Sequence, residues 1–262
     1  MTQETQAGSQ ENYSTRSTGV MNPGSRLNKL SEHSEPSELR AYYERQGEEV
    51  ERSGQGIRCS EESVTRAIIA LLHSELNSFQ TILDVGCGAN LDYDVYLANR
   101  GKDVVGVELS LSFLKLAPRH RRIQLVQGNA TALPFAGGTF EAAICSETVE
   151  HIPSDAAVMA EIARVLHPKG LLIFSVPNLW NLERLVNMVR ERSLTISMME
   201  GHLREYTRRR ALSLLSPHFR VERIVPVPFG WSGRWGSKLD QLVKTGLLAY
   251  GSKSIALVAR RR

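Results

Sequence analysis

Short apolar runs alternate with helical segments along most of the chain. The runs are 81–85, 104–107, 123–126, 142–145, 171–176, 221–227 and 254–259. Apolar strands separated by segments long enough for crossover helices are typical of α/β folds, in which parallel strands are covered by helices. The pattern therefore predicts an α/β protein with a doubly wound, mostly parallel sheet of seven strands.

Four segments show a helical pattern. Ser60 is predicted as the N-cap of a helix whose apolar positions recur every three or four residues. Those positions are Val64, Ile68, Leu71 and Leu72. A second helix is predicted over 154–167, and further helices over 39–50 and 207–215. The helix after Ser60 must bury its apolar face.

The beginning of the chain differs in composition from the rest. Residues 1–38 are rich in Ser, Thr, Gln, Glu and Asn, and their few apolar residues follow no period, which predicts a disordered tail. The whole chain has 262 residues, of which 42% are apolar, enough for one sizeable core. We therefore expect a single catalytic domain over 39–262.

Charge and cysteine content restrict the classes of partner. The sequence pI is near 9.0, yet the formal charge is only +4, which is modest for a nucleic-acid-binding protein. The cysteines Cys59, Cys87 and Cys145 form no C-x-x-C pair, so neither a zinc site nor a disulfide framework is indicated. Without a signal-peptide pattern or an apolar run of membrane-spanning length, we expect a cytoplasmic protein.

A glycine turn follows the first strand directly and marks a cofactor site. Gly86 and Gly88 would let a ligand approach the backbone closely. Glu108 stands 20 residues after Gly88, at the end of the second strand, where a carboxylate can accept hydrogen bonds from ribose hydroxyls. The turn and the acid thus predict one site for a nucleoside cofactor.

The same features occur in dinucleotide-binding folds, but the details argue against NAD. The third glycine of a G-x-G-x-x-G motif would fall at Leu91. Asp84 would also lie next to the pyrophosphate, which an acid disfavours. Asp84 suits a cationic cofactor better.

The stretch Asp84-Val85-Gly86-Cys87-Gly88 resembles the first motif of class I S-adenosylmethionine methyltransferases. This resemblance implies S-adenosyl-L-methionine as cofactor and an antiparallel last strand. It implies cofactor contacts at Asp84, Gly86, Cys87, Gly88, Glu108, Leu109, Asn129, Ala130 and Ser146.

Later motifs follow in the order that the family has. The stretch 127–130 looks like the adenine station, although Asn129 replaces the usual aspartate; its carboxamide oxygen can still accept a hydrogen bond. Residues 146–152 resemble the active-site edge, where Ser146 has the alternative role of capping the strand. Asn90 departs from a glycine found in many relatives. Residues 201–207 resemble an element of O-methyltransferases of quinone and sugar biosynthesis.

His151 is the first candidate for a general base, because an imidazole titrates near neutral pH and could take a proton from an acceptor hydroxyl. Its alternative is an ordinary loop histidine packed at the sheet edge. His202 is a second catalytic candidate. No metal is predicted, because the carboxylates are scattered over different elements without a ligand cluster.

The most favoured function is methyl transfer to the hydroxyl of a small molecule, such as a metabolite, quinone precursor or sugar. An RNA methyltransferase is the first alternative, but the chain lacks a Pro-Cys thiol and an Asn-Pro-Pro-Tyr motif. A catalytically silent cofactor-binding module is the second. The acceptor cannot be read from the sequence, since its pocket would be built from 39–56 and 178–206.

Overall fold

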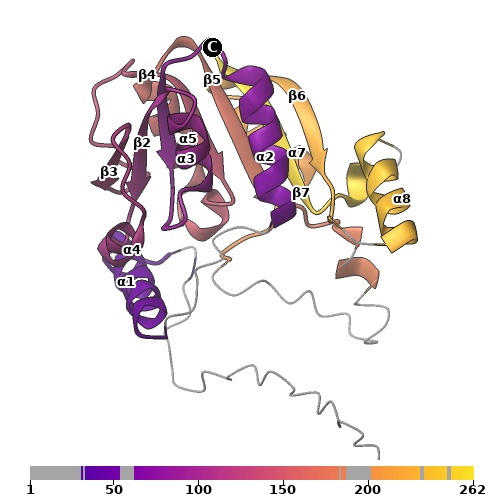
Figure 1. The fold of residues 1–262 in the computed structure, drawn as a ribbon, viewed down its shortest axis with the longest axis horizontal. Helices are drawn as coiled ribbons and strands as arrows, with labels where there is room; N and C mark the ends of the chain where they lie inside the picture. Colours follow the sequence, from indigo (N-terminus) through magenta and orange to yellow (C-terminus); the bar gives the residue numbers. More distant parts are fainter. Residues whose placement is uncertain are drawn as a thin grey trace, which may run out of the picture.

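A computed structural model describes residues 31, 33–53, 62–182, 184–186, 202–230, 233–246 and 249–262. Its centre is a seven-stranded sheet of order β3-β2-β1-β4-β5-β7-β6 (Figure 1). The strands are β1 (Thr81–Val85), β2 (Asp103–Glu108), β3 (Ile123–Gln127), β4 (Phe140–Ser146), β5 (Leu166–Pro177), β6 (Phe219–Val227) and β7 (Ser254–Arg261).

Strand direction in this sheet follows the prediction. β7 runs antiparallel to β5 and β6, and the pairings among β1 to β5 are parallel. The chain proceeds outward from β1 to β3 and then returns to place β4 on the other side of β1. The predicted α/β, doubly wound sheet is therefore confirmed, with its switch point between β1 and β4.

Helices cover both faces of the sheet. They are α1 (Pro36–Ser53), α2 (Glu62–Glu75), α3 (Asp92–Ala98), α4 (Leu111–Leu116), α5 (Asp155–Val165), α7 (Arg208–Leu215) and α8 (Gly233–Lys244), with short 3-10 turns η1 (Val149–His151) and η2 (Ala249–Gly251). No described helix has the length and apolar character needed to cross a membrane.

Neighbouring residues along each strand point into opposite cores, as the pleat of a strand requires. Ile82 packs with α2 and α3, whereas Leu83 packs with α5 and α7. The stripe Val64, Ile68, Leu71 and Leu72 on α2 is buried in the first of these cores, as predicted. Its predicted N-cap, Ser60, lies outside the described residues.

Some element boundaries differ from the sequence prediction. α5 ends at Val165 rather than at residue 167, because Leu166 already pairs with Phe140 in the sheet. α1 begins at Pro36, inside the segment predicted as tail; residues 1–30 and 32 of that tail lie outside the described part. The helices α3, α4 and α8 were not predicted, since α3 and α4 have only 7 and 6 residues and show no repeated period.

Candidate functional site

The glycine turn after β1 adopts a backbone that needs glycine. Gly86 has φ +77° and Gly88 has φ +62°, a region that other residues rarely adopt. A Cβ atom on Gly86 would lie only 2.4 Å from Cγ2 of Thr148, in the loop after β4. The turn thus lies directly against the carboxyl end of β4, at the switch point of the sheet.

Glu108 joins the end of β2 to this turn. Its Oε2 accepts a hydrogen bond from the Gly88 amide at 3.2 Å, and its Oε1 accepts one from the Ser110 amide at 2.9 Å. Burial raises the pKa of the Glu108 carboxyl, although these amides counteract the effect. Leu109 follows at the same edge. The structure therefore brings the predicted turn and acid together.

Asp84 forms a buried acidic pair with Asp94 of α3. Burial raises the pKa of Asp84 well above its ordinary range, with the neighbouring Asp94 adding to the shift; the pKa of Asp94 rises to about 6. Two carboxyls so close favour a shared proton or a cationic neighbour. Asp94 was not predicted, although its place in the helix after the glycine turn is a usable signal.

Two predicted cofactor residues are engaged within the protein. The Cys87 thiol packs towards β2, where a Cβ atom on Gly106 would meet its Sγ at 2.8 Å. The Asn129 side-chain oxygen accepts from the Thr131 amide at 3.0 Å and from the Thr131 hydroxyl at 2.9 Å. An oxygen with two lone pairs is then occupied. Ala130, next in the loop after β3, lies against the core.

Ser146 belongs to a hydroxyl network across the ends of the strands. Its Oγ lies 3.2 Å from the Tyr93 hydroxyl and 2.9 Å from Ser175 Oγ. Ser175 in turn donates to Glu147 Oε1 at 2.8 Å, and burial raises the pKa of Glu147 to about 7. This network ties α3, β4 and β5 together, which matches the capping role weighed for Ser146.

His151 and His202 meet because a distant segment docks on the loop after β4. The Leu203 amide donates to the Glu150 carbonyl at 2.8 Å. The buried Arg204 guanidinium donates to the carbonyls of Val149, Ile152 and Pro153. These bonds hold the segment 202–206 along the loop 149–153.

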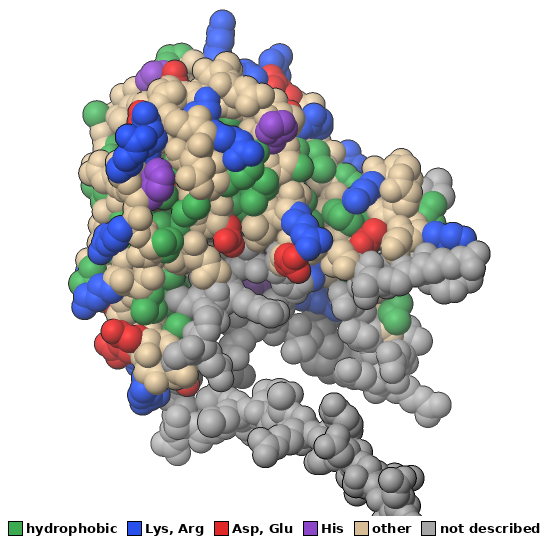
Figure 2. Space-filling model, in the orientation of Figure 1, with side chains coloured by type: hydrophobic (Ala, Val, Ile, Leu, Met, Phe, Trp, Pro, Cys, Tyr) green, Lys and Arg blue, Asp and Glu red, His purple; other side chains and the backbone are tan. Residues whose placement is uncertain are grey.

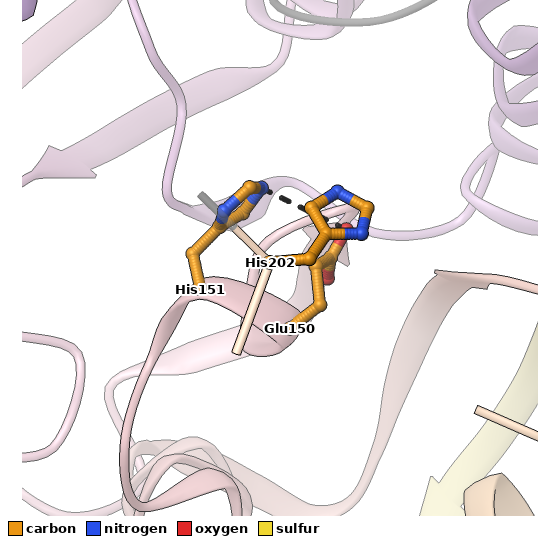
Figure 3. Close-up of side chains that lie close together, drawn as sticks. All are labelled: Glu150, His151 and His202. Carbon is orange, nitrogen blue, oxygen red and sulfur yellow. Dashed lines mark ion pairs between the residues drawn. The ribbon is translucent and has the colours of Figure 1, made fainter. Parts of the chain in front are cut away.

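Glu150, His151 and His202 form a cluster that the sequence did not predict (Figure 3). The His151 and His202 rings are 4.8 Å apart at 82°, and His151 Nε2 lies 3.9 Å from Glu150 Oε1. The Glu150 side chain is 0% exposed, and neither of its oxygens has a hydrogen-bond partner among the described residues. No cluster of metal-ligating side chains that includes a carboxylate was predicted from the sequence, and this is wrong here. Glu150 and His202 are about 50 positions apart in the sequence, yet the fold brings them together.

Tyr43 of α1 also belongs to this site. The segment 39–56 was assigned to the acceptor pocket from the sequence, but this residue was not singled out. Its hydroxyl is buried and lacks a hydrogen-bond partner among the described residues, and its ring stacks edge-on with His151 at 6.1 Å. Burial, with Glu108 and Glu150 nearby, raises the pKa of Tyr43. Glu44 holds the helix in place by accepting from the Ser112 amide at 2.9 Å.

A cavity of about 1490 Å³ opens beside the cluster. Glu147, Glu150, His151 and His202 line one part of it. Apolar residues of α2, of β6 and of the segment just after β6 line another: Ala67, Ala70, Leu71, Val225 and Phe229. The cavity has room for a small molecule with an apolar body and a polar group directed at the cluster.

Residues 83–174 match the family model described as a methyltransferase domain. The match runs from β1 into β5 and includes the glycine turn, Glu108 and the Glu150–His151 pair, while His202 lies beyond it. The site geometry and the family match therefore coincide in the same part of the sheet.

Curated relatives cover part of the chain. A demethylmenaquinone methyltransferase of Renibacterium salmoninarum is 38% identical over 95 residues, which are 36% of this chain and 40% of the relative. A ubiquinone biosynthesis O-methyltransferase of Psychrobacter arcticus is 34% identical over 106 residues, 37% of this chain and 40% of the relative. The matches thus span about 40% of the length of these relatives.

Solved structures share the fold over a longer range. The 1,6-didemethyltoxoflavin-N1-methyltransferase of Burkholderia thailandensis, solved with S-adenosylhomocysteine, has a TM-score of 0.60 and 20% identity, covering 87% of this chain and 91% of its own. The [4+2]-cyclase SpnF has a TM-score of 0.56 and 18% identity, covering 79% and 84%. At such identities the likeness shows the fold alone.

Proposed function

We propose that the chain transfers a methyl group from S-adenosylmethionine to a small molecule, because residues 83–174 match the model of a methyltransferase domain. The observation that carries the proposal is the contact between the glycine turn and Glu108. The Gly88 amide and the Glu108 carboxylate are 3.2 Å apart at the sheet's switch point, where α/β folds bind nucleoside cofactors.

The ribose, the adenine and the methionine end of the cofactor each have suitable protein groups beside them in this proposal. The ribose hydroxyls bind Glu108, and the adenine lies near Leu109 and Ala130. The cationic methionine end lies by Gly86 and the Asp84–Asp94 pair, because two neighbouring carboxyls repel each other as anions unless a proton or a positive charge lies between or beside them. The occupied oxygen of Asn129 gives this residue a role in shaping the loop after β3.

The acceptor occupies the cavity with its hydroxyl at Glu150, His151 and His202. Its oxygen attacks the methyl carbon as the carbon–sulfur bond breaks, and the bonding electrons stay on sulfur. The hydroxyl proton passes to a base at this cluster, for which His151 is the first candidate. The products are the methyl ether and S-adenosylhomocysteine. Because the sulfonium already activates the methyl group, alignment of the two reactants supplies most of the acceleration.

A quinone precursor or a similarly sized hydroxylated metabolite is the proposed acceptor class. The mixed lining of the cavity supports it, as does the likeness of this domain to enzymes named for menaquinone and ubiquinone biosynthesis. For RNA, the charge pattern offers less support, since Figure 2 shows Lys and Arg side chains dispersed among Asp and Glu on the face in view.

A different reaction on the same fold is the second candidate. The fold alone does not decide between the two, because a [4+2]-cyclase shares it. Release of S-adenosylhomocysteine on incubation with S-adenosylmethionine and a metabolite extract distinguishes methyl transfer from this alternative and from a silent binding module.

Calorimetry with S-adenosylmethionine and S-adenosylhomocysteine tests the cofactor site. Glu108→Ala removes two charge-assisted ribose bonds of about 1.5 to 3 kcal/mol each, so affinity should fall more than about 100-fold. Asp103→Ala is the matched control, because Asp103 is the first residue of β2 and so lies at the end of the strand opposite to Glu108. The absence of binding to the parent protein would refute the proposed function.

A further inference from the structure

Glu150, His151 and His202 offer one carboxylate and two imidazoles to a common point, and we propose that they bind a divalent transition-metal cation at the acceptor end of the site. The site itself stands on the geometry of these side chains. The role of the cation in methyl transfer rests on the proposed function.

The buried carboxylate of Glu150 is the first argument. Its side chain is 0% exposed, and within the described part of the chain neither oxygen accepts a hydrogen bond. A carboxylate in such a place is strongly disfavoured unless a positive charge or a donor compensates it. The two imidazoles beside it provide ligands, and a cation held among the three supplies the missing charge.

The placement of the imidazoles is the second argument. One potential ligand atom from each of the three residues lies within 4.8 Å of the other two. Ligand atoms around a cation with bonds of about 2.1 Å lie about 3.0 to 3.4 Å apart. Rotation of the His151 side chain, which is 26% exposed, and a small shift of the largely buried His202 ring close this difference. Their nearly perpendicular rings, at 82°, can direct both nitrogens at one point.

The surroundings of His202 are the third argument. Glu205 Oε1 lies 3.8 Å from His202 Nδ1 and is paired with Arg184 at 3.0 Å. A carboxylate at one ring nitrogen is the usual partner of a metal-bound histidine, because it fixes the ring and makes the other nitrogen a better ligand. Nε2 of His202 is then the nitrogen that binds the cation.

Two imidazoles and one carboxylate favour zinc, iron(II), cobalt(II) or manganese(II) over magnesium or calcium, which prefer oxygen ligands throughout. Three protein ligands leave positions for the oxygen of the acceptor. Coordination lowers the pKa of that hydroxyl, so its proton passes to water and the oxygen attacks the methyl carbon. In this arrangement His151 acts on the acceptor's proton through the cation.

The direct test uses the full-length, tag-free protein, stripped with a chelator and desalted. Cobalt(II) titration followed by visible absorption, and zinc calorimetry, should both saturate at one equivalent. Glu150→Gln and His202→Ala should each weaken binding more than about tenfold, since removal even of a supporting residue costs about 10- to 100-fold. His73→Ala is the matched control, because His73 lies exposed on α2.

The change in melting temperature on adding zinc is a second readout. A variant that is merely misfolded would not match the parent's stability in chelator. In chelator, Glu150→Gln should be at least as stable as the parent, because a neutral amide of similar size replaces a buried carboxyl that lacks a compensating partner without the cation. With zinc, the melting temperature of the parent should rise and that of the variant should not. No binding to the parent, or parental affinity in both site variants, overturns the inference.

S-adenosylhomocysteine calorimetry on the same preparation separates this inference from the proposed function. Cofactor binding without cation binding refutes the metal site alone. Cation binding without cofactor binding leaves the metal site standing and refutes methyl transfer.

Discussion

The two halves of the site are assembled in different ways. On the cofactor side, the glycine turn and Glu108 are placed by neighbouring parallel strands, and Asp84 pairs in register with Gly106. On the acceptor side, Glu150 and His151 meet His202 only because the segment 202–206 docks on the loop after β4. Damage to the first half should therefore abolish cofactor binding, whereas damage to the second should leave it intact.

Gly86→Ala should have the largest effect. The new Cβ meets Thr148 at 2.4 Å and the backbone keeps φ +77°, so we expect a loss of about 2 to 5 kcal/mol in the free energy of unfolding and of measurable cofactor affinity. Gly101→Ala is the control, because Gly101 has φ +82° but open space around it. Equal effects in urea unfolding would show that the contact with Thr148 does not matter.

Arg204→Met should break the acceptor half selectively. The substitution leaves the carbonyls of Val149 and Ile152 without their buried donor, at a cost of about 2 to 4 kcal/mol in stability. Turnover and cation affinity should fall while S-adenosylhomocysteine affinity holds. Arg209→Met is the control, because Arg209 is exposed on α7; it should change neither the stability nor the turnover. Loss of cofactor affinity in folded Arg204→Met would contradict the division into two halves.

Asp94→Asn tests the buried acidic pair on the cofactor side through the pH dependence of stability. The pKa of Asp94 is raised from 3.8 to about 6, so the folded protein binds more protons than the unfolded chain between these values. Stability from this pair is therefore present at low pH and is lost as pH rises towards 6. The variant should be more stable than the parent at pH 7, by about 1 to 3 kcal/mol, with the difference vanishing below about pH 4. Denaturant unfolding at several pH values measures this, and Asp92→Asn serves as control.

Tyr43→Phe should have the smallest effect and tests where the halves meet. Removal of a buried hydroxyl that has no partner among the described residues should raise stability by up to about 1 kcal/mol. Its position between Glu108 and Glu150 predicts a modest rise, under about tenfold, in the Km of cofactor or acceptor. Tyr96→Phe, on α3, is the control. Unchanged kinetics would assign Tyr43 to packing alone.

The sequence alone was sufficient for the sheet. Its seven apolar runs form the seven strands, and the apolar stripe on α2 is buried in one of the two cores. Both patterns were readable because they depend on residues only a few positions apart. The glycine turn and Glu108 were readable for the same reason: positive φ and the end of a parallel strand are local properties. The short helices α3 and α4 were not readable, since they have only 7 and 6 residues and show no repeated period. The start of α4 is also held by the distant Glu44, which accepts from the Ser112 amide.

The acceptor half was decided by tertiary structure. Glu150 in the sequence is one acid among many, and only the docking of 202–206 buries it beside two imidazoles. Tyr43 likewise gains its place because Glu44 anchors α1 against α4. Burial and charge compensation depend on which distant segments pack together, and spacing along the chain carries no record of that packing.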